Sequence, residues 1–317
     1  MGSYIIRRLG IGLILAFIAA SIAFFAIRLL PGDPIVLYTA QSQQLMSEER
    51  MDLLRHELGL DRSLFVQYLS WLNDVVHGRL GYSIYYHEKV SALLADRLPV
   101  TLHLGLMALA ISGVCGMALG AFAALKKGTW VDRSVTYLVN CVIAIPVFWL
   151  CVMMIYIFGL KLQLFPIAGY ASPMNNLWLN FRQIAMPVFC LSVPGTAIIA
   201  RQMRSSMLEV LRQDYIRTAW AKGMNENAII FRHALKNSMI PVLTILGAGM
   251  GMMLGGSVII ETIFAIPGIG RLMASSVFAK DYLVIQSGTL ILGLVTITIN
   301  LLVDIAYSWC DPRIRYS

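Results

Sequence analysis

The sequence predicts an all-α integral membrane protein with six transmembrane helices, a helical insertion outside the membrane and a helical loop in the cytoplasm. Three observations predict this class. The 317 residues are 58% hydrophobic and only 13% charged, too little charge to cover the surface of a soluble domain of this size. The apolar residues form long uninterrupted runs, whereas barrel strands would alternate. The basic residues stand in the gaps between these runs, as in membrane proteins.

The transmembrane helices are predicted from the length of the apolar runs. A helix that crosses a bilayer core of about 30 Å needs on the order of 20 apolar residues. The fourth run is the shortest and contains Pro187 and Pro194. No small-residue cleavage site follows the first run, so we expect it to be a retained anchor. The six runs are 9–27, 100–124, 137–160, 184–200, 240–260 and 285–307.

The distribution of lysine and arginine predicts the orientation. With a cytoplasmic N-terminus, fourteen basic residues fall in inner loops and four in short outer loops, as the positive-inside rule requires. An even number of spans returns the C-terminus to the same side, so both termini are expected in the cytoplasm. The outer four are Lys161, Arg182, Arg271 and Lys280.

Two insertions divide the chain into segments 1–29 (N-terminal tail and first span), 30–99 (external helical insertion) and 100–317 (five-helix transmembrane core, with the inner loop at 201–239). In the external insertion, Ser47 can cap a helix that Gly59 ends, and a second helix is expected over 63–77, with its apolar residues mostly on one face. These helices are predicted to cover the outer mouth of the bundle, to receive a partner, or to serve only as a lid over helix ends.

The inner loop 201–239 is long and basic, and it is predicted to be helical with a break after Gly223. Such a loop docks onto a partner or lies on the membrane surface, held to anionic lipid by its arginines. Ala219 and Gly223 are four residues apart, so on a helix they would form a small-residue face that another backbone can approach. Alternatively, Gly223 only terminates a helix.

No pattern of residues in this sequence indicates how the chain itself could drive a solute uphill across the membrane. Ion-coupled carriers place titratable groups at the middle of the bilayer, but His103, Glu261 and Asp304 lie near the ends of spans. We find no phosphate-binding GxxxxGK[ST] loop, metal cluster or catalytic constellation, and we expect the five cysteines to be packing residues. We therefore expect that a subunit on another chain supplies the energy for uphill movement across the membrane. We expect no nucleic-acid partner.

Ten short motifs in a fixed order carry a resemblance to a known family over nearly the whole chain. The chain resembles the permease subunits of binding-protein-dependent ABC importers, in the B-type subunit of the dipeptide, oligopeptide and nickel group. The resemblance implies the type I importer permease fold. The motifs are YIIRRL at 4–9, LPGDP at 30–34, LGLD at 58–61, GRLGYS at 78–83, IPVFW at 145–149, RSSMLEVL at 204–211, DYIRTA at 214–219, ETIF at 261–264, PGIGR at 267–271 and DPRIR at 311–315.

The resemblance implies that the inner loop is the family's coupling motif, which fits into a cleft on the ATPase. Arg217 and Thr218 replace the first two residues of the generic Glu-Ala-Ala pattern, and Trp220 stands where a small residue or arginine is usual. The implied coupling residues are Arg217, Thr218, Ala219, Ala221, Lys222, Gly223, His233 and Asn237.

The resemblance also implies the partners and the location. A second homologous permease subunit, two ABC ATPase subunits that carry ATP and Mg²⁺, and an external solute-binding protein are expected in the bacterial inner membrane. This chain itself would hold no cofactor and would not be an enzyme. Peptides, glutathione, nickel and other metal chelates all belong to the group, and nothing in the residues selects among them.

A doubled GxxxG pattern in the fifth run predicts close helix packing. Gly247, Gly251 and Gly255 would lie on one helix face. We expect this face to meet either a partner permease or a neighbouring helix of the same chain. A self-sufficient carrier or channel is the alternative to the importer permease, and a membrane-embedded enzyme is a third class that lacks a candidate nucleophile or base.

Overall fold

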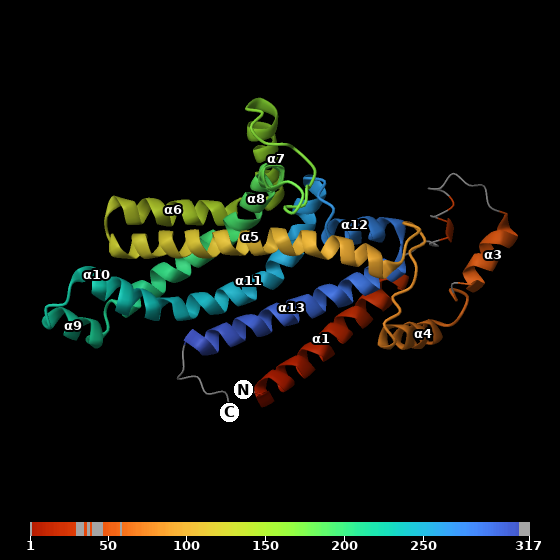
Figure 1. Ribbon diagram of the computed structural model, residues 1–317, viewed down its shortest axis with the longest axis horizontal. Helices are drawn as coiled ribbons and strands as arrows, with labels where there is room; N and C mark the ends of the chain where they lie inside the picture. The colour runs from red at the N-terminus through yellow and green to blue at the C-terminus, as the bar shows by residue number, and fades with distance from the viewer. Residues whose placement is uncertain (1, 30–34, 37–38, 40–46, 58, 311–317) are drawn as a thin grey trace.

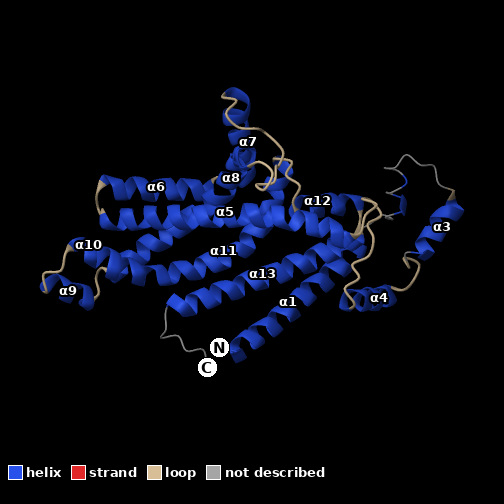
Figure 2. Cartoon of the chain, in the orientation of Figure 1, coloured by secondary structure: helices blue, strands red, loops and turns tan. Residues whose placement is uncertain are grey.

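The computed structural model describes residues 2–29, 35–36, 39, 47–57 and 59–310. The described chain is almost entirely helical, and its only β interaction is an isolated bridge between Tyr82 and Lys89 (Figure 2). The motifs predicted at 30–34 and 311–315 lie outside the described residues. The helices are α1 (Gly2–Leu29), α3 (Glu48–Glu57), α4 (Leu64–Val76), α5 (Val90–Leu125), α6 (Trp130–Ala144), α7 (Val147–Met154), α8 (Leu177–Val210), α9 (Asp214–Ala221), α10 (Glu226–Ala228), α11 (Lys236–Ile263), α12 (Ile269–Ala279) and α13 (Tyr282–Cys310), with π-helical segments η1 (Ile155–Lys161) and η2 (Ile229–Leu235).

The membrane spans agree with the prediction except in the third run. Five helices are long and apolar enough to cross a membrane, and a bent helix pair brings the number to six in the described residues. The third run is not one straight helix, because α6 and α7–η1 meet at an angle of 100°. Pro146 causes the break, since it disfavours helical backbone at Ile145, which is extended (φ −79°, ψ 123°).

Two helices extend beyond their apolar runs. Helix α5 begins at Val90 and continues through Pro99, so the boundary expected between 99 and 100 falls within one helix. Helix α8 continues past the fourth run to Val210 and contains both Pro187 and Pro194. Because α8 continues to Val210, the segment that follows it lies at the end of the bundle and not at its middle. The predicted coupling loop is positioned there.

The two insertions lie at opposite ends of the bundle (Figure 1). Helices α9 and α10 are at one end, beside the turn that joins α5 to α6. Helices α3, α4 and α12 are at the other end. Helix α1 runs towards α4 and α13 runs back along it, so the start of α1 and the end of α13 lie away from the external insertion (Figure 1).

The external insertion confirms its predicted helix limits, but α4 packs differently from the prediction. The Ser47 hydroxyl accepts a hydrogen bond from the Arg50 N–H at 3.4 Å, and Gly59 follows α3 with φ +65°. In α4, Trp71 is buried in a cluster with Ala20 and Phe24 of α1. The other apolar side chains of α4 do not all share this face, and Leu64, Phe65, Leu69 and Val76 are exposed.

Helices α5 and α8 share the most extensive contact of the described helix pairs. A Cβ atom added at Gly120 would lie 2.7 Å from Met203 Cβ, and one added at Gly116 would lie 2.9 Å from the Thr196 carbonyl oxygen. Side chains at these positions would push the helices apart. The GxxxG spacing in the second span therefore permits this crossing.

At the end of the bundle that carries the external insertion, which the sequence predicts to be the outer end, Glu261 fixes the start of α12. This buried carboxylate accepts hydrogen bonds from the Thr101 hydroxyl at 2.8 Å and from the Arg271 N–H at 2.9 Å. The Thr101 hydroxyl in turn accepts from the Ile269 N–H at 2.9 Å. A Cβ atom at Gly268 would clash with the Glu261 carboxylate. Glu261 is thus a structural residue that joins α5, α11 and α12.

A second buried carboxylate, Asp281, joins the external insertion to the start of α13. It accepts hydrogen bonds from the Ser83 hydroxyl and, at 3.4 Å each, from the Tyr85 and Val284 N–H groups. Burial raises the pKa of Asp281 above its ordinary value, and the hydrogen bond from Ser83 opposes this rise. Segments nearly 200 residues apart in the chain are held together here.

Candidate functional site

The predicted coupling loop forms three short helical pieces at one end of the bundle: α9, α10 and η2. Gly223 ends α9 with φ +71°. Its N–H donates to the Trp220 carbonyl at 2.9 Å, and the Met224 N–H donates to the Ala219 carbonyl at 3.3 Å. These two bonds make a Schellman motif, which favours glycine at this position. The Asn225 side chain then accepts from the Asn227 N–H at 3.0 Å and starts α10. The predicted break after Gly223 is confirmed.

Helix α9 is amphipathic, and its apolar face is turned towards its own chain. Ile216 and Ala219 are buried in a cluster with Met203 and Met207 of α8 and Ile229 of η2. The expected small-residue face of Ala219 with Gly223 is therefore not formed. Ala219 lies against the core, while nothing lies within 4 Å of a Cβ atom placed on Gly223. Ala221, two positions before Gly223, is exposed.

The outer surface of α9 and the segment after it define what we call the coupling surface. It carries basic side chains interleaved with aromatic ones. Among the aromatic residues, Trp220 is 48% exposed and Phe231 is 67% exposed. The two acidic residues of this stretch, Asp214 and Glu226, are also exposed. The surface is made of the exposed residues Tyr215, Arg217, Thr218, Trp220, Ala221, Lys222, Gly223, Phe231, Arg232 and Lys236.

The remaining predicted coupling residues, His233 and Asn237, lie beside this surface, and Asn237 is itself exposed. The Asn237 amide donates to the Tyr215 hydroxyl at 3.1 Å and to the His233 carbonyl at 2.9 Å. Asn237 therefore joins the start of α11 to α9. His233 is half-buried in η2. Tyr215 and Phe231 were not among the predicted site residues, and Trp220 was named only as a departure from the family pattern, although aromatic side chains among basic ones are a signal for a binding surface.

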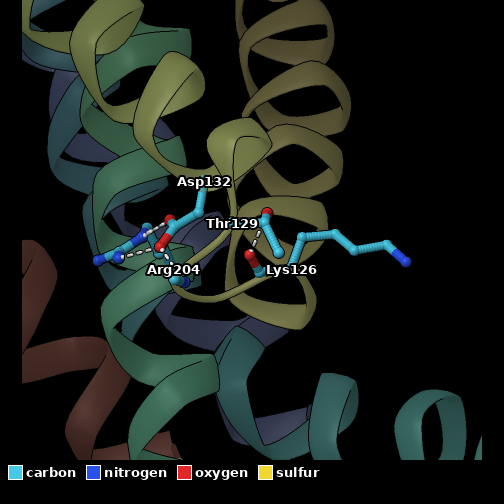
Figure 3. Close-up of polar contacts among 5 residues, drawn as sticks. Lys126, Thr129, Asp132 and Arg204 are labelled. Atoms are coloured by element: carbon cyan, nitrogen blue, oxygen red, sulfur yellow. Dashed lines mark hydrogen bonds and ion pairs between the residues drawn. The ribbon is translucent and has the colours of Figure 1, made fainter.

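An ion pair beside the coupling surface holds the turn between α5 and α6 against α8 (Figure 3). Arg204 donates from Nε to Asp132 Oδ1 at 2.6 Å and from its terminal nitrogen to Oδ2 at 2.9 Å. Asp132 is buried and also accepts from the Gly128 N–H at 3.0 Å. Thr129 closes the turn by donating to the Lys126 carbonyl at 2.6 Å. Bidentate geometry gives this pair a fixed orientation.

The glycines predicted in the fifth span are only partly covered by the chain. A Cβ atom on Gly251 would lie 3.4 Å from Thr296 Cγ2 of α13, an ordinary contact. A Cβ atom on Gly255 would have no described residue within 4 Å, and Gly247 is buried. Part of the face therefore meets a neighbouring helix, and the part around Gly255 is open.

Two family models together match almost the whole chain. Residues 116–316 match the binding-protein-dependent transport system inner membrane component, and residues 1–105 match the N-terminal part of such membrane components. A putative peptide permease protein of Brucella suis is 40% identical over 98% of both chains. A probable peptide ABC transporter permease protein of Sinorhizobium fredii is 39% identical over the full length of both. The di/tripeptide transport system permease protein DppB of Pseudomonas aeruginosa is 37% identical over 100% of this chain and 99% of its own.

Solved structures of ABC transporters share the fold. The inward-facing MetNI methionine ABC transporter superposes with a TM-score of 0.58 at 17% identity, covering 69% of this chain and 96% of the other. An amino acid ABC transporter crystallised with histidines gives a TM-score of 0.50 at 16% identity, covering 71% and 95%. The helical arrangement is thus that of ABC importer permeases.

Proposed function

The chain belongs to the family of binding-protein-dependent transport system inner membrane components and is a permease subunit of an ABC importer, and from this we propose that its coupling surface docks onto a separate ATPase subunit. In this proposal two ATPase subunits bind ATP and Mg²⁺. A second homologous permease completes the translocation pathway. An external binding protein delivers the solute, and the coupling end, with both termini, faces the cytoplasm.

The proposal that the coupling surface docks onto an ATPase subunit rests on the difference between the buried and the exposed face of α9. Ile216 and Ala219 are already covered by the chain's own core. A helix that lies on a membrane surface inserts its apolar face into the lipid, and α9 has no such face free. What remains outside is a mixed basic and aromatic surface. Arginine and tryptophan are enriched among the residues that dominate protein interfaces, and Arg217 can pair with carboxylates on the partner.

We propose peptides as the solute. The three relatives compared above are named as peptide or di/tripeptide permeases over nearly the full length of this chain. The same names give no support to nickel. In this proposal the external binding protein makes the first selection and this chain forms half of the pathway.

Charge reversal on the coupling surface tests the proposal. We expect the double substitution Arg217→Glu/Lys222→Glu to reduce co-purification of the ATPase subunits about tenfold or more, because it replaces attraction by like-charge repulsion. Both side chains are exposed, so membrane insertion should not change. Arg182→Glu, at the opposite end of the bundle, is the matched control. ATPase recovery equal to that of the control would place the docking surface elsewhere.

Two substitutions that add a side chain test whether the coupling surface contacts a partner, without straining the backbone of the chain itself. Ala219 is unsuitable because it is buried, and a tryptophan there would disrupt the chain's own core. Ala221→Trp adds volume on the exposed side of α9, and Gly223→Asn adds a side chain that tolerates left-handed backbone. We expect both to lower peptide uptake and ATPase recovery together. Ion-gradient-driven uptake by the chain without ATPases would instead favour a self-sufficient carrier.

A further inference from the structure

A polar pocket at the outer end lies between the end of α1, helix α4 and the start of α13. Its volume is about 290 Å³, and its wall includes three arginines, Arg28, Arg62 and Arg79, but only one acidic residue, Asp74. Asp74 is already paired with Arg79 at 3.0 Å. Among the described residues, no carboxylate pairs with Arg28 or Arg62. The wall of the pocket therefore has an excess of positive charge.

The arginine at the end of α1 is held in a fixed orientation. Gln67 donates to the Leu60 carbonyl at 3.2 Å and to the Arg62 carbonyl at 2.9 Å, which fixes its amide. Its Oε1 then accepts from Arg28 Nε at 2.9 Å. The guanidinium also lies 3.6 Å from the centre of the Phe24 ring and donates to the Phe24 carbonyl at 3.3 Å. One terminal nitrogen of Arg28 keeps donors that no described residue accepts.

Trp71 lines the same pocket and carries an unsatisfied polar group. It is 7% exposed, and its indole N–H is buried with no hydrogen-bond partner among the described residues. A buried donor without an acceptor costs stability, on the order of 1 to 3 kcal/mol. The two arginines without carboxylate partners among the described residues are suited to an oxygen-rich anion. Guanidinium groups match phosphate and carboxylate oxygens in particular.

A neighbouring groove indicates where the anion comes from. It is apolar, about 530 Å³ in volume, and runs along α1 with Ile18, Ile22 and Phe25 in one wall and Tyr68 of α4 in the other. Tyr68 directly follows Gln67, and its hydroxyl is 2.8 Å from the Ser21 hydroxyl. Helix α1 is a candidate membrane span that ends at Leu29. An acyl chain along this groove would bring its headgroup to the level of Arg28.

We propose that the arginine pocket binds a phosphate group, with an outer-leaflet phospholipid headgroup as its source and one acyl chain in the groove on α1. The bound lipid would add a further connection between the external insertion and the first span, which already meet through the ring cluster of Phe24, Tyr68 and Trp71 and through the Ser21–Tyr68 and Arg28–Gln67 hydrogen bonds. This proposal is independent of the coupling surface, which lies at the other end of the bundle.

The test uses the full-length chain purified in detergent with its accompanying subunits. Native mass spectrometry would measure retained lipid, and thermal unfolding would measure stabilisation, with three probes: phosphatidylglycerol, diacylglycerol with the same acyl chains, and inorganic phosphate. We expect phosphatidylglycerol to be retained and stabilising, and diacylglycerol not to be. Stabilisation by inorganic phosphate alone would keep the phosphate site and assign its source to free anions.

Two variants make the test specific. Arg28→Gln and Arg62→Gln should each lower retention of phosphatidylglycerol about tenfold, because hydrogen bonds from a charged donor are roughly twice as strong as neutral ones. Arg62 is exposed, so its variant folds even if Arg28→Gln does not. Arg182→Gln, outside the pocket, is the control. Equal retention in all three variants, or equal retention of diacylglycerol, would overturn the proposal.

Discussion

At the outer end of the bundle, α12 is fixed by the buried carboxylate of Glu261, whereas at the opposite end α9 rests on the apolar side chains of Ile216 and Ala219. Glu261 joins three helices through hydrogen bonds of 2.8 and 2.9 Å. Helix α9 has one side-chain hydrogen bond to α11, from Asn237 to Tyr215. Directional bonds of buried groups allow one arrangement, but apolar contacts are not directional. We therefore expect the outer end to be rigid and the position of α9 at the coupling end to be adjustable.

The largest effect is expected from Glu261→Ala. The substitution leaves the Thr101 hydroxyl and the Arg271 N–H without their acceptor in a buried site, and each unsatisfied group costs about 1 to 3 kcal/mol. We expect a clear fall in the thermal unfolding temperature of the detergent-purified protein. Glu209→Ala, at an exposed position on α8, should stay within about 0.5 kcal/mol of the wild type. Similar unfolding temperatures for both variants would contradict the rigid outer end.

An intermediate and local effect is expected from Ile216→Ala. Truncation of a buried isoleucine costs about 2 to 5 kcal/mol, and here the loss falls on the attachment of α9. We expect faster hydrogen exchange at the amides of α9 and weaker ATPase recovery, while the exchange of α5 and α12 is unchanged. Glu209→Ala, at an exposed position on α8 outside the coupling surface, is the control. Faster exchange throughout the bundle would show that the coupling end is as strongly connected as the outer end.

The smallest effect is a pH dependence at Asp281. Burial raises its pKa in the folded protein above the ordinary value of 3.8. The folded state therefore binds the proton more tightly than the unfolded state, so the contribution of Asp281 to stability is full below the ordinary pKa and is lost as the pH rises through the folded pKa. Thermal unfolding measured across this pH range should show the decline. Asp281→Asn should flatten it, and an unchanged slope would remove Asp281 as its cause.

Much of the fold was predictable because the decisive signals are local. The apolar runs set the number of spans, Ser47 and Gly59 limit α3, and the break after Gly223 follows from the backbone freedom of glycine. The bend of the third span also has a local cause, Pro146, but its angle of 100° depends on what α7 packs against. The number of spans, the limits of α3 and the break after Gly223 could therefore be assigned from the residues alone, whereas the limits of α5 and α8 and the bend of the third span were not.

The sequence predicted the position of the basic loop in the chain, but it did not predict which face of α9 is buried. The basic loop 201–239 was located from its composition, and exposed Arg217 and Lys222 agree with the expected surface. The side on which Ala219 lies was not predictable, because Met203 and Met207 of α8 and Ile229 of η2 decide which face of α9 is buried. An eight-residue helix has too few apolar positions to specify its own inward face.

The sequence by itself determined that this protein is a helical membrane protein with six apolar runs and a basic loop, because hydrophobic length and charge are properties of the chain. Only the tertiary structure decided the roles of Glu261, Asp281 and Arg28. Glu261 meets Thr101 across 160 positions of sequence, Asp281 meets Ser83 across 198, and Arg28 meets Gln67 across 39. A buried polar group is costly or stabilising according to its partners, and folding alone brings those partners to it.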